Sequence, residues 1–148
     1  MIRSIVVGTD GSETAMKAVQ EAADLAAAVG ATINIVSAYA PVSTQRLREE
    51  KRQAPEEVQW QVTPREDVDA MLSEAERQVT GAGVGDVSTY AREGDPADAI
   101  LDVAEEHGCD LIVVGNKGMT GAKRFLLGSV PNKVSHHAPC SVLIVRTT

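Results

Sequence analysis

Short apolar stretches alternate along the chain with longer segments of helical periodicity. The apolar stretches are rich in β-branched residues, which is typical of buried strands, and they predict strands at 4–7, 32–38, 87–91, 111–114 and 142–145. Helical spacing of apolar residues predicts helices from Ser12 to Gly30 and over 65–79, 96–107 and 129–137. Strands that alternate with helices in this way predict an α/β fold, a single domain with a Rossmann-like, doubly wound, five-stranded parallel sheet.

One segment interrupts this rhythm. Residues 41–64 are polar and mix both signs of charge, with Arg46 and Arg48 beside Glu49 and Glu50. A connection of this length in a compact domain is either a functional lid or a disordered excursion, and composition favours neither. We therefore expect residues 1–148 to form one domain with a polar, flexible insertion at about 41–64.

Composition narrows the classes of function. The formal net charge is −7, so broad nucleic-acid binding is not expected, because that activity needs a basic face. The apolar runs are far shorter than the roughly 20 residues of a membrane span. The first residues lack a signal-peptide pattern, so we expect a cytoplasmic protein with no membrane partner. Cys109 and Cys140 lack metal-ligand spacing and are expected to be reduced thiols near strand starts.

Two loops that follow predicted strands carry the candidate chemistry. In an open parallel sheet, ligands bind beyond the carboxyl ends of the strands, where such loops gather. The first loop is 8–12, with the sequence Gly-Thr-Asp-Gly-Ser. The second contains Gly115 and Gly118, and nine residues later Gly128 and Ser129 at the start of the last predicted helix.

The second loop has the properties of a phosphate-binding segment. Glycines permit positive φ and a close approach of the backbone, so that N–H groups can point at phosphate oxygens. Ser129 opens a helix whose first N–H groups lack internal partners and whose dipole favours an anion. Lys117, Lys123 and Arg124 either add local positive charge for a polyphosphate or only cover the surface.

With these motifs the chain resembles the universal stress protein family, in its ATP-binding branch, over nearly its whole length. The resemblance rests on the glycine spacing of the second loop, on the loop 8–12, on Gly94-Asp95-Pro96 and on the closing strand 141–145. It implies a fold of the adenine nucleotide alpha hydrolase type and a role in binding ATP or another adenine nucleotide, with Mg²⁺ able to accompany the phosphates.

The resemblance also implies which residues form the site. Those implied to hold the phosphates are Gly115, Gly118, Gly128, Ser129 and Val130. Backbone at Thr9 and Ala38 is implied to frame the adenine, and Asp10 to contact the ribose. From the residues alone, Asp10 either caps the first helix or accepts hydrogen bonds from a ligand hydroxyl.

A homodimer is the further implication of the resemblance, with the strands Ser141 to Val145 of two subunits pairing antiparallel across a twofold axis. A short apolar strand near the end of the chain would otherwise leave backbone groups unpaired at a sheet edge. The alternative is an edge protected by the flanking Arg146 and the polar residues after it.

We find no catalytic or metal-ligating residues in the pattern. His136 and His137 fall near the end of the last predicted helix, and the glycine spacing departs from that of a P-loop ATPase. The sequence therefore predicts an adenine-nucleotide binding protein with a sensing or regulatory role in the stress response, at most a weak ATPase. The alternatives are a slow ATP-hydrolysing or adenylating enzyme, and a nucleotide-independent dimeric interaction module.

Overall fold

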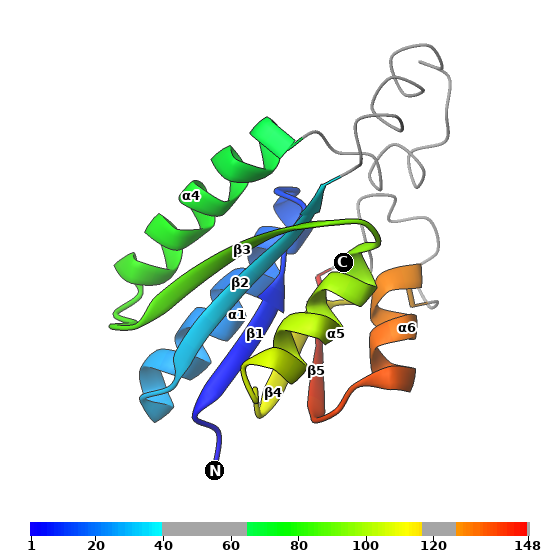
Figure 1. Ribbon diagram of the computed structural model, residues 1–148. Coiled ribbons are helices and arrows are strands. Elements are labelled where there is room, and N and C mark those ends of the chain that lie inside the picture. The colour runs from blue at the N-terminus through cyan, green and yellow to red at the C-terminus, as the bar shows by residue number, and fades with distance from the viewer. Residues whose placement is uncertain (40–64, 117–126, 148) are drawn as a thin grey trace.

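A computed structural model describes residues 1–39, 65–116 and 127–147 of the chain (Figure 1). Its strands are β1 (Ser4–Gly8), β2 (Thr32–Tyr39), β3 (Val87–Glu93), β4 (Leu111–Gly115) and β5 (Ser141–Val145). Its helices are α1 (Glu13–Val29), α4 (Arg65–Gly81), α5 (Pro96–Glu106) and α6 (Ser129–His137). The predicted succession of elements is confirmed, whereas the predicted insertion at 41–64 lies outside the described residues.

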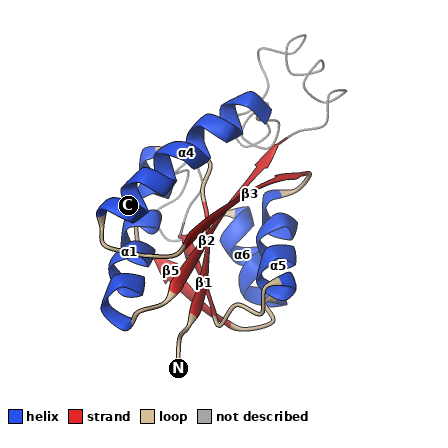
Figure 2. Cartoon of the chain, turned by 60° about the vertical axis from the view of Figure 1, so that its left-hand side comes forward, coloured by secondary structure: helices blue, strands red, loops and turns tan. Residues whose placement is uncertain are grey.

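All five strands form one parallel sheet in the order β3-β2-β1-β4-β5, which confirms the predicted fold class. Helices α1 and α4 cover one face, and α5 and α6 cover the other (Figure 2). The sheet is therefore the middle of three layers, as expected for a doubly wound fold. No helix in the described ranges is both long and apolar enough to span a bilayer.

The core is aliphatic and is divided by the sheet into two clusters. Alternation along β1 places Ile5 and Val7 in the cluster under α1 and α4, and Val6 in the cluster under α5. On α1 the buried positions are mostly alanines, at Ala18, Ala22, Ala23 and Ala26. Because these side chains are small, α1 lies close against the sheet.

Both ends of α1 are set by local hydrogen bonds. Ser12 is the N-cap, and its Oγ accepts a hydrogen bond from the Ala15 N–H at 3.1 Å. Gly30 is the C-cap in the left-handed region, with φ of 73° and its N–H bonded to the Ala26 carbonyl. The sequence left open whether Asp10 caps this helix, and the structure assigns the cap to Ser12.

Buried polar groups at the amino end of the sheet are paired with one another. Asn34, 7% exposed, donates from Nδ2 to the Ile5 carbonyl and the Ser4 hydroxyl, both at 3.2 Å, and to Cys109 Sγ at 3.6 Å. Cys109 and Cys140 are free and lie just before β4 and β5, as expected. Burial raises the pKa of the Cys109 thiol, which keeps it in the neutral form that accepts this bond.

A carboxylate completes this end of the sheet. Asp110 Oδ2 accepts hydrogen bonds from the Arg3 N–H at 2.8 Å and the Ser4 N–H at 3.1 Å, and these bonds lower the pKa of Asp110. The Asp110 N–H in turn donates to the Ser4 carbonyl. Asp110 therefore continues the pairing of β1 with β4 beyond the first residue of each strand.

We expect Gly30→Ala to destabilise the protein by about 1–2 kcal/mol, because an alanine Cβ is strained at positive φ although open space surrounds it. Gly81→Ala is the matched control, since Gly81 also faces open space but lacks a positive φ. That control should be neutral or slightly stabilising. Urea unfolding of both variants measures the difference, and equal stabilities would contradict the assignment of Gly30 as a strained C-cap.

Candidate functional site

A cleft opens at the carboxyl ends of β1, β2 and β4. The space between its walls is about 630 Å³, including the part that is open to solvent. The lining residues are Gly8, Thr9, Asp10, Ala15, Val36, Ser37, Ala38, Pro96, Ile100, Val114, Gly115, Val130 and Pro131. The chain leaves β1 for α1 on one face and reaches α6 on the other face after β4, so the cleft lies where the connections diverge.

Five of the eight residues that the sequence pointed to line this cleft: Thr9, Asp10, Ala38, Gly115 and Val130. Gly128 and Ser129 lie immediately before Val130, as the N-cap and first residue of α6, and are not among the lining residues. Gly118 lies outside the described residues, as do Lys117, Lys123 and Arg124. The fold thus brings together residues that lie more than 100 positions apart in the chain.

The loop after β1 is held by its own hydrogen bonds. The Thr9 N–H donates to the Val36 carbonyl at 3.0 Å, and the Thr9 hydroxyl accepts from the Gly11 N–H at 3.1 Å. Gly11 has φ of 79°, and a Cβ there would collide with the side chain of Met71. The positive φ is the reason why the turn favours glycine at position 11, since the flexible Met71 side chain can move aside.

Asp10 is the ionisable side chain among the described residues that line the cleft. Its Oδ1 accepts a hydrogen bond from the Ser12 N–H at 2.9 Å, which orients the half-buried carboxyl group. Burial raises the pKa of Asp10, and the hydrogen bonds from Ser12 oppose that rise without cancelling it. A ligand hydroxyl that donated to this carboxylate would replace water lost on burial.

The glycine-rich segment after β4 differs in two ways from the sequence-based argument. Gly128 has φ of −63°, and Gly115 is not among the glycines with positive φ, so neither uses the left-handed region. The Gly128 N–H is not turned toward the cleft but donates to the Asn116 carbonyl at 2.9 Å. The first-turn N–H groups of α6 at Ser129 and Val130 lack acceptors inside the helix, and such an exposed helix N-terminus favours an anion.

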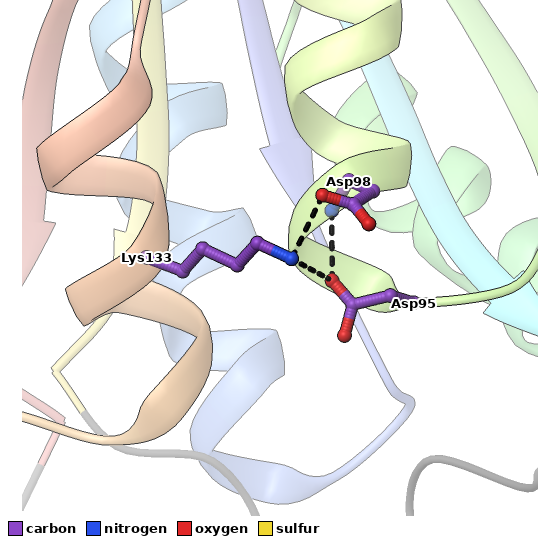
Figure 3. Close-up of polar contacts among 3 residues, drawn as sticks. All are labelled: Asp95, Asp98 and Lys133. Carbon is purple, nitrogen blue, oxygen red and sulfur yellow. Dashed lines mark hydrogen bonds and ion pairs between the residues drawn. The ribbon is translucent and has the colours of Figure 1, made fainter.

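Helices α5 and α6 are joined beside the cleft by a cluster of Asp95, Asp98 and Lys133 (Figure 3). Lys133 Nζ lies 3.3 Å from Asp95 Oδ2 and 2.9 Å from Asp98 Oδ1, and the hydrogen bond to Asp98 is the main reason why its pKa is raised. Asp95 is also the N-cap of α5. The cluster therefore holds the first turns of α5 and α6 together. These turns contribute Pro96 and Pro131 to the lining of the cleft.

Sequence reasoning missed part of the cleft wall, notably Ser37, Pro96 and Ile100. Ser37 is the serine within the apolar run of β2 and is 3% exposed, and Pro96 belongs to the motif Gly94-Asp95-Pro96. Ile100 packs where a Cβ at Gly8 would collide with it, so Gly8 makes room for this wall. Ser37 within an apolar strand and Pro96 within the motif Gly94-Asp95-Pro96 were the signals that could have found these residues.

Other chemical groups lie away from the cleft. His136 and His137 end α6 as expected, and Glu106 pairs with Arg92 at 2.8 Å. Within the part of the chain that the structure describes, no group of three or more His, Cys, Asp or Glu residues is placed to hold a metal ion. Of the described residues that line the cleft, only Asp10 carries a charge.

Comparisons with known proteins agree with this architecture. The model of the universal stress protein family matches residues 1–146. A universal stress protein of Mycobacterium tuberculosis (strain H37Rv) is 39% identical over 148 residues, which cover 99% of this chain and 97% of that protein. A universal stress protein of Bacillus subtilis (strain 168) is 36% identical over 151 residues, covering 99% of this chain and 100% of that protein.

A solved structure shows the same likeness in three dimensions. The crystal structure of a universal stress protein in complex with cAMP has a TM-score of 0.72 and 33% identity, and covers 99% of this chain and 98% of that one. The resemblance stated from the sequence is thus confirmed at the level of the family. The chain belongs to the universal stress protein family.

Proposed function

We propose that this protein binds an adenine nucleotide, with ATP as the leading ligand, in the cleft at the carboxyl ends of β1, β2 and β4. The observation that carries the proposal is the meeting of Asp10, the Ala38 backbone and the first turn of α6 around one cleft. In a stress-sensing or regulatory role, the presence or absence of the bound nucleotide would be the signal that the protein passes on. Asp10 is the single ionisable side chain among the described lining residues, which supports binding without a dedicated catalytic step.

The parts of a nucleotide fit the parts of the cleft. Apolar walls from Val36, Ile100 and Val114 suit a flat base, with the backbone at Thr9 and Ala38 beside them. Asp10 can accept a hydrogen bond from a ribose hydroxyl. The N-terminus of α6 at Ser129 and Val130 suits the phosphates, and a Mg²⁺ ion would arrive with them.

A relative with a bound ligand supports the adenine part of the proposal. The similar universal stress protein was crystallised with cAMP, which shares the adenine and ribose of ATP and differs in its phosphate. Membership of the ATP-binding branch is our finer proposal. A cytoplasmic location is also proposed, and the two free cysteines are typical of a reducing compartment.

We further propose a homodimer through β5. This strand is an edge of the sheet and pairs with β4 on one side. Leu143 lies on it and is 38% exposed, so a large apolar side chain on this edge strand reaches the solvent in the single chain. Pairing with the β5 strand of a second copy would cover this side chain and give hydrogen-bond partners to the backbone N–H and C=O groups at the sheet edge.

The proposed function is tested by titrating the wild-type protein and the Ser129→Pro variant with ATP and with adenosine in a calorimeter. Proline suits the first helical position and the extended Gly128 before it, so α6 should persist while one N–H and the hydroxyl are lost. ATP affinity should fall by about tenfold or more, and adenosine affinity should stay unchanged.

Ser129→Ala serves as the control that removes only the hydroxyl. Failure of the wild-type protein to bind any adenine nucleotide would contradict the proposed function. Steady-state ATP turnover above roughly 1 per second would contradict the part of the proposal that assigns no catalytic step.

For Asp10→Asn we expect weaker binding of ATP and adenosine, by about tenfold or more, because a charged acceptor for the ribose is lost. Asparagine keeps an acceptor for the Ser12 N–H, so the turn should persist. Since burial raises the pKa of Asp10, folding favours its neutral form, and its contribution to stability declines as pH rises through that raised pKa.

The variant should therefore melt no lower than the wild-type protein at pH 7. Calorimetric titration and thermal melting measure the two effects. Unchanged affinity in Asp10→Asn would remove Asp10 from the proposed site.

Leu143→Lys should convert the proposed dimer into a monomer, because it places a charge on the strand edge that the second copy would cover. Val29→Lys is the matched control, since Val29 is a comparable exposed apolar side chain, 49% exposed, at the end of α1. Light scattering coupled to size exclusion gives the masses. A wild-type protein that is monomeric, or a Leu143→Lys variant that stays dimeric, would overturn the assignment to β5.

A further inference from the structure

Asn116 is the meeting point of three segments that are distant in sequence. Its N–H donates to the Val145 carbonyl at 2.8 Å, at the end of β5, and its carbonyl accepts from the Gly128 N–H at 2.9 Å, at the N-cap of α6. Its side-chain Oδ1 accepts from both the N–H and the hydroxyl of Thr147, at 2.9 Å and 3.0 Å. One residue thus bonds the end of β4 to α6 and to the residues after β5.

Thr147 is anchored as firmly as a core residue although it lies near the end of the chain. It is 5% exposed, and its carbonyl accepts a hydrogen bond from Lys17 Nζ of α1 at 3.4 Å. Thr147 is not among the residues that line the cleft. Its contacts therefore run from α1 through Asn116 to the first residues of α6.

We propose that Asn116 is a positioning residue that ties Gly128, at the start of α6, to Thr147, so that Thr147 affects anion binding from outside the cleft. The proposal rests on the proposed function for the identity of the anion, a nucleotide phosphate. The Gly128 N–H is held by Asn116, which fixes where α6 begins. If Asn116 were less firmly held, the first-turn N–H groups of α6 would be less ordered in the free protein. Binding would then have to order them, and the affinity for the anion would fall.

The chemistry of asparagine suits this position. Its amide oxygen can accept two hydrogen bonds while the side chain stays neutral. Both donors come from Thr147, and the N–H donor belongs to backbone that is buried, where an unpaired donor is costly. An aspartate would keep the acceptor but add a negative charge near the N-terminus of α6, where we propose that the phosphates bind.

The test compares Asn116→Ala, Thr147→Val and the double variant with the wild-type protein, each titrated with ATP and with adenosine. Thr32→Val is the matched control, because the Thr32 hydroxyl makes one hydrogen bond, to the Arg3 carbonyl at 3.4 Å, at the opposite end of the sheet. ATP affinity should fall about three- to tenfold in Thr147→Val and further in Asn116→Ala, with adenosine affinity unchanged in both.

In the Asn116→Ala background, adding Thr147→Val should cause no further loss, because the two residues act through the same bond. The proposal is overturned if Thr147→Val binds ATP as tightly as Thr32→Val does, or if ATP and adenosine affinities fall together. Thr147→Val keeps nearly the same volume, so it decides the matter even if Asn116→Ala does not fold.

A second measurement separates this proposal from the proposed function. Amide hydrogen exchange at Gly128 should be faster in Thr147→Val than in Thr32→Val, in the absence of any nucleotide. If the wild-type protein binds no adenine nucleotide, the proposed function fails, and the exchange rate alone decides the tie between Thr147 and α6. An unchanged rate at Gly128 would then overturn the tie.

Discussion

The pairing of β1 with β4 at the centre of the sheet is the constraint on which the rest of the structure depends. It sets Val7 beside Val113, so that the two following residues, Gly8 and Val114, both reach the cleft. The chain runs from β1 to a helix on one face and arrives after β4 at a helix on the other. A parallel sheet in which these connections part leaves a crevice that its own backbone does not fill.

The two ends of the sheet treat their polar groups in opposite ways. At the amino end, Asn34, Ser4 and Asp110 bond to one another or to nearby backbone, so these polar groups have partners within the protein. At the carboxyl end, burial raises the pKa of the half-buried Asp10 carboxyl group, and Ser129 and Val130 begin a helix without internal acceptors for their N–H groups. The polar groups available to a ligand thus lie at the carboxyl end, where Asn116 and Thr147 also bond to each other.

The fold could be predicted almost completely because its signals are local. β-Branched runs, helical spacing and the glycine after α1 each act within a few residues, and together they are consistent with one topology. The site was only partly predictable, because Ser37 and Ile100 reach the cleft through the packing of β2 and α5, which no short motif records. The hydrogen bond from the Gly128 N–H to the Asn116 carbonyl likewise joins residues that are distant in the chain, and no local pattern predicts it.

The state of Cys109 has a consequence for redox chemistry. Oxidants and disulfides react with the thiolate form of cysteine, and burial raises the pKa of Cys109 and of Cys140, so that little thiolate forms in either. Cys109 is also enclosed, at 6% exposure. Peroxide should therefore spare Cys109, while more acidic and more accessible thiols of other molecules are oxidised first.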